Sequence, residues 1–330
     1  MILKGDKLRV VGVSRGNEYS PNHIGNDAAI FTLVADELTK KGCEVSIYPE
    51  KEFVAKNIDA DYVFDMARDR ATISRLKEME DNGTVVVNSA YGIDNCVRKP
   101  MTEILLANGI PHPKSFILNT NEYVFPEIFP CWIKRGDSHA MVKEDVVYVE
   151  CMEEAELVMA DFRKRNIPTA VVNEHLIGDL IKFYGVAGTD FFYTFYPTEQ
   201  SHSKFGLEAI NGENRGYPFD KDKLRIMANS AAAILNVPIY GGDCVVSSTG
   251  EIRIIDFNDW PSFARCRDEA APYIAECIYE ELRSQVVEEV RSLKLIDLIF
   301  NFQLSIYLFP EALSTCQLVN FQFTIYKNNE

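Results

Sequence analysis

Residues 240–263, YGGDCVVSSTGEIRIIDFNDWPSF, place two carboxylates and an amide among apolar residues. The apolar runs on either side of SSTG are typical of β-strands, and SSTG is typical of a turn, so the sequence predicts a hairpin. Asp256 and Asn258 are two residues apart and share one face of their strand. Asp243 approaches both in the paired strands, and three oxygen donors of this kind suit Mg²⁺. The alternative is that they are solvent-facing loop residues, and for any one of them alone that alternative is favoured.

The composition limits the class of protein. A chain of 330 residues with 47% hydrophobic residues can bury a large core and form two or three domains. The net charge of -15 and the lack of a basic run argue against a nucleic-acid partner. Eight scattered cysteines without a C-x-x-C pair indicate reduced thiols, and the N-terminus has no long apolar segment, so we expect a cytoplasmic protein.

Two kinds of pattern follow one another along the chain. Up to about residue 95, the apolar runs KLRVVGV, CEVSIYP, DYVFDM and TVVVNSA alternate with segments typical of helices, which predicts a parallel α/β domain. Beyond a helix expected at 98–108, runs such as CWIKR, DVVYVE, TAVVNEH, LIKFYGVAG and FFYTFYP predict an antiparallel α+β region. Further helices are expected at about 153–165 and 220–235, and over RDEAAPYIAECIYEEL after the hairpin.

The segment 295–326 differs from the rest because no Lys or Arg occurs in it. Its apolar residues alternate with polar ones, which favours amphipathic strands over a membrane-spanning helix. The apolar face of such strands can cover the protein, pair with another chain or promote aggregation. We therefore expect no membrane partner, and a homo-oligomer is one of the alternatives.

The order of the short motifs resembles that of a known superfamily. Lys99 precedes a helix that ends in GIPHP, Lys134 ends the strand CWIKR, a later strand ends in NEHLIGD, and the hairpin supplies GGD and IDFN. This order resembles the ATP-grasp superfamily, which includes glutathione synthetase and D-alanine:D-alanine ligase. The resemblance implies an ATP-grasp fold behind an N-terminal parallel α/β (pre-ATP-grasp) domain. The implied domains are 1–95, a small lobe at 96–180, a large lobe with the hairpin at 181–290, and an apolar extension at 291–330.

The resemblance also implies where the ATP phosphates bind. Lys99 and Lys134 would hold the phosphates as point charges, and Lys182 could face them from the adjoining strand. The loop RGDSHAMVKED after Lys134 departs from the superfamily, in which it is often glycine-rich. Ser138, His139 and backbone N–H groups could still bind phosphate there. The alternative for Lys182 and His139 is an exposed polar residue without a role.

The remaining ATP contacts and the metal follow from the same resemblance. In VVNEHLIGD, Glu174 and the backbone of His175 and Leu176 would meet the adenine edge, and Asp179 would accept the ribose hydroxyls. The implied cofactors are ATP and Mg²⁺, with Mn²⁺ as a substitute. The implied metal ligands are Asp243, Asp256 and Asn258.

Two further groups of residues could bind the other substrate. Arg265 and Arg267 follow the hairpin and could clamp a substrate carboxylate, and the alternative is a solvated helix start. The loop SRGNEYSPNHIGND lies before a helix N-terminus, which is a natural anion site. Its candidates are Arg15, Ser20, Asn22 and His23.

The function implied by the resemblance is an ATP-dependent ligase that joins a small carboxylate to an amine or a thiol through an acyl phosphate. This chemistry needs positioning, Mg²⁺ and cations but no protein nucleophile, and the sequence shows neither a G-x-S-x-G motif nor a Cys/His signature. The alternatives are a small-molecule kinase of the same fold and a regulatory protein that binds ATP without turnover.

Overall fold

The structure is a computed structural model that describes residues 8–19, 24–197, 210 and 213–284. The expected strands of 295–326 and the candidates Ser20, Asn22 and His23 lie outside these residues. Met1–Tyr279 form one compact unit and Glu280–Glu330 a second one, of which only the end of a helix at 267–284 is described. None of the described helices is long and apolar enough to cross a membrane.

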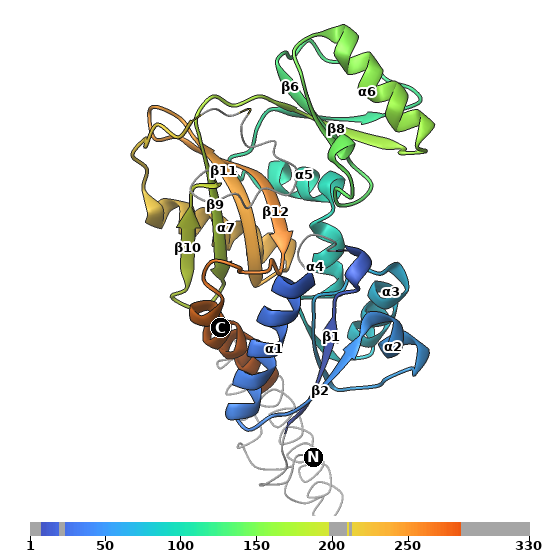
Figure 1. Cartoon of the computed structure of the whole chain (residues 1–330), viewed down its shortest axis with the longest axis vertical. Helices are drawn as coiled ribbons and strands as arrows, with labels where there is room; N and C mark the ends of the chain where they lie inside the picture. The colour runs from blue at the N-terminus through green and yellow to red at the C-terminus, as the bar shows by residue number, and fades with distance from the viewer. Residues whose placement is uncertain (1–7, 20–23, 198–209, 211–212, 285–330) are drawn as a thin grey trace, which may run out of the picture. The chain divides into compact units, whose positions relative to one another are not determined.

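The first sheet is parallel, as predicted. Its order is β2-β1-β3-β4, and every neighbouring pair is parallel. Helix α1 packs on one face and α2 and α3 on the other (Figure 1), so β3 is buried along its whole length. The bounds are β1 Arg9–Ser14, η1 Asn17–Tyr19, α1 Ile24–Lys40, β2 Glu44–Pro49, α2 Glu50–Ala55, β3 Tyr62–Asp65, α3 Arg70–Asp81, β4 Val85–Val87 and α4 Ala90–Asn95.

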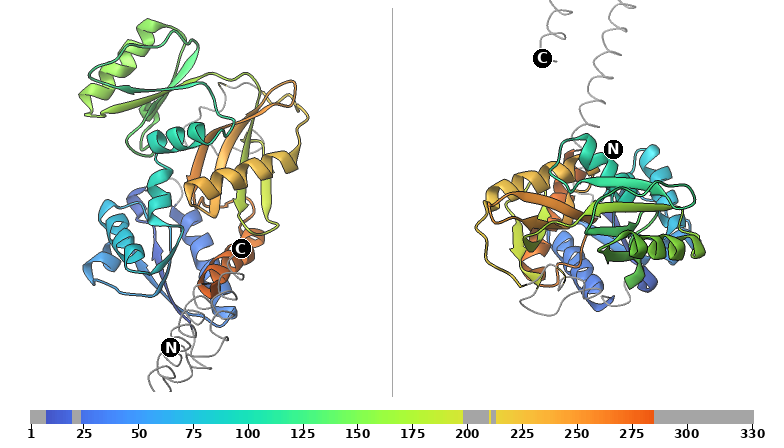
Figure 2. Two further views of the ribbon diagram at one scale, coloured as in Figure 1. Left: turned by 180° about the vertical axis from the view of Figure 1, so that it is seen from behind. Right: turned by 90° about the horizontal axis from the view of Figure 1, so that it is seen from above.

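The second sheet is antiparallel and has the order β5-β8-β6-β7. Helix α6 covers one face of it (Figure 2), and its Phe162 packs with Ile133 and Val172 of the strands. Strand β5 follows the Pro-rich connector and was not predicted from the sequence. The bounds are α5 Arg98–Ala107, β5 Ser115–Asn119, β6 Cys131–Arg135, η2 Lys143–Asp145, β7 Val146–Val149, α6 Met152–Lys164 and β8 Thr169–Glu174.

The third sheet contains the predicted hairpin. Its order is β10-β9-β11-β12 with antiparallel neighbours, and the hairpin is β11 and β12. Helix α7 lies across one face (Figure 2) and buries Phe183, Tyr240 and Phe257. The other face carries Lys182, Asp243, Asp256 and Asn258. The bounds are β9 Asp179–Val186, β10 Phe192–Phe195, α7 Lys221–Leu235, β11 Ile239–Val246 and β12 Ile252–Asp259.

Side chains that follow strands of the parallel sheet hold the end of the hairpin. Arg15, directly after β1, donates to the carbonyl of Trp260 at 3.2 Å. Arg68, three residues after β3, forms an ion pair with the buried carboxylate of Asp259. Asn88, directly after β4, exchanges two hydrogen bonds of 2.7 and 3.0 Å with the backbone of β11. The carboxyl edge of the parallel sheet therefore meets the hairpin where its polar face ends.

Candidate active site

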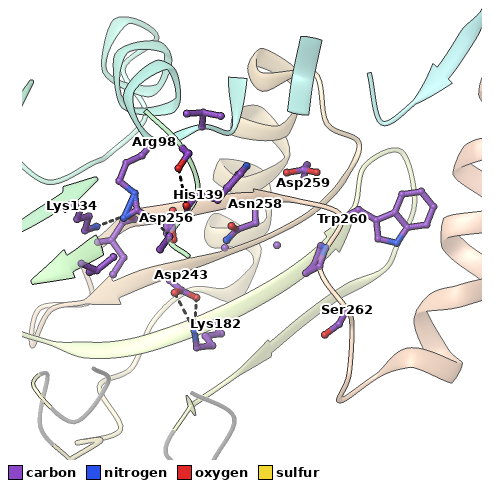
Figure 3. Close-up of a pocket in the computed structure, with 18 of the residues that line it drawn as sticks. Arg98, Lys134, His139, Lys182, Asp243, Asp256, Asn258, Asp259, Trp260 and Ser262 are labelled. Carbon is purple, nitrogen blue, oxygen red and sulfur yellow. Dashed lines mark hydrogen bonds and ion pairs between the residues drawn. The ribbon is translucent and has the colours of Figure 1, made fainter. Parts of the chain in front are cut away.

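One face of the third sheet carries a row of charged side chains. Lys182 on β9, Asp243 on β11 and Asp256 on β12 are in register across three neighbouring strands. On the other face, Phe183 and Phe257 are fully buried under α7. The alternation of a β-strand thus sends the aromatic rings into the core and the charged groups into a cavity (Figure 3).

The cavity above this row has a volume of about 650 Å³. Side chains from the second and third sheets, from α5 and from the segments that follow β1 and β3 line it, so it is built by distant parts of the chain. A volume of this size is in the range of small-molecule sites. The predicted site residues that line it are Arg15, Lys134, Ser138, His139, Glu174, Leu176, Lys182, Asp243, Asp256, Asn258 and Arg265.

The charged groups of the cavity are paired with one another. The ammonium of Lys182 lies 3.1 Å from both carboxylate oxygens of Asp243. The guanidinium of Arg98 lies 3.4 Å from Oδ2 of Asp256. Lys134 donates to the carbonyl of Ile255 at 3.2 Å. These side chains carry three positive and two negative charges, which leaves a positive excess facing the cavity.

Lys134 is the most buried of these cations. Burial, together with the charge of Arg98, lowers the pKa of its ammonium to about 8, although Asp256 and Asp243 oppose the shift. An anion entering the cavity would favour the charged form and raise this pKa again. Lys134 is therefore suited to bind an anionic group in the cavity.

At the start of α5, Arg98 lines the cavity and the predicted Lys99 does not. Arg98 is 9% exposed and lines the cavity, whereas Lys99 is exposed and is not among the lining residues. The backbone N–H of Lys99 donates to the carbonyl of Gly136 at 3.0 Å. Successive residues of a helix point about 100° apart, so only one of the pair can face the cavity.

The predicted hinge residues differ in their placement. Glu174 and Leu176 line the cavity, but His175 does not. The Nδ1 atom of His175 accepts a hydrogen bond of 3.1 Å from the indole of Trp132, which does line the cavity. The carboxylate of Glu174 accepts from Arg253 at 2.8 Å and from a backbone N–H at 2.7 Å. Glu174 thus joins the second and third sheets with its side chain.

Asp179, which was predicted to accept ribose hydroxyls, lies away from the cavity. Asp179 is 2% exposed and is not among the residues that line the cavity. Its two oxygens accept hydrogen bonds from the backbone N–H groups of Arg215 and Tyr217, at 2.8 and 2.7 Å. The carboxylate therefore anchors the backbone that leads to α7.

The loop between β6 and β7 forms one wall of the cavity. Ser138 and His139 line it, and the hydroxyl of Ser138 donates to the carbonyl of His139 at 3.1 Å. The far end of the loop is held by the buried carboxylate of Asp145, which accepts from the backbone N–H groups of Met141 and Val142 at 2.7 and 3.1 Å. Asp145 therefore fixes the end of the loop that leads into β7.

The end of the cavity beyond the hairpin carries Arg265 but not Arg267. The guanidinium of Arg265 lies 4.4 Å from the centre of the Phe195 ring, and both residues line the cavity. Arg267 does not line it and instead donates to Asn26 of α1 at 2.8 Å. Arg15 lines the cavity, but its guanidinium is bound to Asp27 at 3.0 Å.

The oxygen donors on the hairpin fit a magnesium ion. Asp243 and Asp256 are cross-strand partners, and Asn258 lies two residues further on the same face, opposite Gly241. A Cβ at Gly241 would lie 2.7 Å from a side-chain carbon of Pro261, so only glycine leaves room there. Two carboxylates and an amide are hard donors of the kind Mg²⁺ takes together with phosphate oxygens. Within the described part of the chain, no three His, Cys, Asp or Glu side chains form a metal cluster.

The fold is that of ATP-grasp proteins. The D-alanine–D-alanine ligase from Bacillus anthracis, complexed with ATP, superposes with a TM-score of 0.63 at 14% identity, over 85% of this chain and 99% of that chain. The D-alanine–D-alanine ligase from Coxiella burnetii gives 0.59 at 12% identity, over 87% of this chain and 100% of that chain. A RimK-domain ATP-grasp protein from Sphaerobacter thermophilus gives 0.59 at 15% identity, over 82% of this chain and 99% of that chain. No protein-family model matches the chain, and no curated protein matches it.

Proposed function

We propose that the protein is an ATP-dependent ligase that joins a carboxylate to an amine or a thiol through an acyl phosphate. The observation that carries the proposal is the convergence of three cations, Arg98, Lys134 and Lys182, with the carboxylates Asp243 and Asp256 in one cavity. Cations next to hard oxygen donors are what a nucleotide triphosphate with its metal ion requires. The fold supports the proposal, since one of its structural neighbours is a ligase complexed with ATP.

The lining residues suggest how the nucleotide would lie. The base would occupy the end near Trp132 and Leu176, and the phosphates would lie above the three cations. Asp243, Asp256 and Asn258 would hold Mg²⁺, which neutralises phosphate charge when it is bound. The acid would enter from the end lined by Arg265, whose guanidinium on an aromatic ring is a typical partner for a carboxylate.

The reaction then needs only two bond exchanges. An oxygen of the substrate carboxylate attacks the γ-phosphorus of ATP, and the bond from that phosphorus to ADP breaks. The nitrogen of the amine next attacks the carbonyl carbon of the acyl phosphate, phosphate leaves with the electrons of the C–O bond, and the nitrogen loses a proton to solvent. The cations of the cavity stabilise the negative charge that moves from one oxygen to the next.

The test is an ADP-release assay with pools of carboxylates and amines, followed by mass spectrometry of the product. A ligase gives a condensed product, and hydroxylamine in place of the amine traps the acyl phosphate as a hydroxamate. A kinase gives a stable phosphate ester with hydroxyl substrates instead. Asp256→Asn is the control for contaminating ATPases, because it should abolish the signal. If Mg-ATP neither binds nor turns over, the proposal is wrong.

A further inference from the structure

The proposed metal ligands are already engaged by cations of the same chain. Lys182 and Asp243 are cross-strand partners on β9 and β11, and the ammonium contacts both carboxylate oxygens at 3.1 Å (Figure 3). Both side chains are largely shielded from solvent, with 20% and 24% of their surface exposed. Asp256 has a weaker contact of 3.4 Å with Arg98. The Lys182–Asp243 pair is therefore the tighter of the two.

An ammonium in this position competes directly with a metal ion. A magnesium ion binds carboxylate oxygens at about 2.1 Å. Lys182 now donates to both oxygens of Asp243, so the ammonium and a metal would share the same two acceptors. The two positive groups also repel each other across a partly buried site. A free divalent cation must therefore displace Lys182 from Asp243 and add its own charge to a cavity that already has a positive excess.

Phosphate oxygens change this balance. When metal and nucleotide arrive together, the ammonium of Lys182 can exchange the carboxylate of Asp243 for a phosphate, and the carboxylate can exchange the ammonium for the metal. Each ligand thus removes the obstacle to the other. By linkage, the nucleotide raises the affinity for the metal by the same factor as the metal raises the affinity for the nucleotide.

We infer, resting on the proposed function, that Lys182 is an exchangeable counter-ion that excludes free divalent cations and admits the metal only together with a nucleotide. Lys182 is a specificity-determining residue in this role, and its effect is separable from its contact with phosphate. Removing the charge should weaken nucleotide binding but strengthen binding of the free metal. A residue that served phosphate alone would show only the first effect.

The experiment measures Mn²⁺ binding to the full chain by electron paramagnetic resonance, with and without a non-hydrolysable ATP analogue. Lys182→Met should raise the affinity for free Mn²⁺ about tenfold or more, and Lys182→Arg should leave it within about threefold of wild type. Lys134→Met is the matched control, because it removes one positive charge from the same cavity without a direct contact to Asp243. It should raise the affinity for free Mn²⁺ less than about threefold.

Three results would overturn the inference. If Lys134→Met and Lys182→Met raise Mn²⁺ affinity equally, only the overall charge matters. If Lys182→Met leaves Mn²⁺ affinity unchanged while wild type still binds Mn²⁺ with the analogue, the counter-ion role is wrong and the proposed function stands. If the wild-type protein binds Mn²⁺ neither alone nor with the analogue, both the counter-ion role and the proposed function are wrong. Should Lys182→Met not fold, wild type alone decides, because equal Mn²⁺ affinity with and without the analogue contradicts the inference.

Discussion

Arg98 and Lys99 offer a test because the structure places Arg98 in the cavity, whereas the sequence predicts that Lys99 binds phosphate. Arg98→Met and Lys99→Met each remove one positive charge from the first turn of α5. Arg98 lines the cavity with 10% of its side chain exposed and faces Asp256, whereas Lys99 is exposed. The structure therefore predicts that Arg98→Met weakens ATP binding and that Lys99→Met does not.

The size of the effect follows from the environment of each group. A charge-assisted hydrogen bond from a shielded guanidinium to a phosphate contributes about 1.5–3 kcal/mol, so Arg98→Met should weaken ATP binding about 10- to 150-fold. The loss also leaves Asp256 without its 3.4 Å contact, which adds a like charge near the phosphates. A substitution at the exposed Lys99 should stay within about 0.5 kcal/mol, or about twofold.

The assay is calorimetric titration of both variants with a non-hydrolysable Mg-ATP analogue, after a melting curve has shown that each is folded. The ratio of the two dissociation constants cancels any general effect of lost charge, because both variants lose one unit in adjacent positions. A large loss of ATP affinity in Lys99→Met, with none in Arg98→Met, would refute the structural placement and support the prediction made from the sequence.

Four further outcomes are expected. Burial lowers the pKa of His112 from 6.5 to about 4. As the pH drops from about 6.5 to 4, the unfolded chain binds a proton that the folded chain does not, so the free energy of unfolding falls by up to about 3 kcal/mol. His112→Gln should remove that part of the pH dependence in urea unfolding. Asp256→Asn and Asn258→Ala should each keep the melting temperature close to that of wild type but lower ATP turnover about a hundredfold or more. Wild-type rates in both variants would instead favour the alternative that these residues face solvent without a role. Asp179→Ala should destabilise the protein by about 2–3 kcal/mol without changing ATP affinity, since both of its oxygens bind backbone N–H groups; a loss of affinity at unchanged stability would favour the ribose role. Amide exchange in the loop 135–145 should slow on adding Mg-ATP, and unchanged exchange there would mean that ATP binds without closure of this loop.

The layers of the fold were predictable because burial imposes a period on the sequence. Strands buried on both faces gave the continuous apolar runs of the parallel sheet, and period two gave the hairpin, with Asp256 and Asn258 on one face. The same reasoning could have found Arg98. The buried positions of α5 are Arg98, Met101, Thr102 and Leu105, which form one helical stripe that Lys99 does not share.

Contacts between distant segments were not predictable in this way. An aspartate after a hinge is chemically as suited to ribose hydroxyls as to backbone N–H groups, and the partners of Asp179 lie 36 and 38 residues further along the chain. Nothing local in the sequence distinguishes these two roles. The pairing of Arg68 with Asp259, over 191 residues, is hidden for the same reason.

Residues that follow strands of the parallel sheet also shape the end of the cavity where the substrate is proposed to bind. Trp260 and Phe263, directly after the hairpin, have φ values of 27° and 48°, which residues with a side chain adopt at a cost of about 1–3 kcal/mol each. Such a backbone persists only where its surroundings fix it, and here Arg15 holds the carbonyl of Trp260 while Arg68 holds Asp259. Both arginines follow strands of the parallel sheet. The segment that leads from the proposed metal ligands to Arg265 is therefore shaped by residues from the first quarter of the chain, a dependence that no pattern within residues 1–95 indicates.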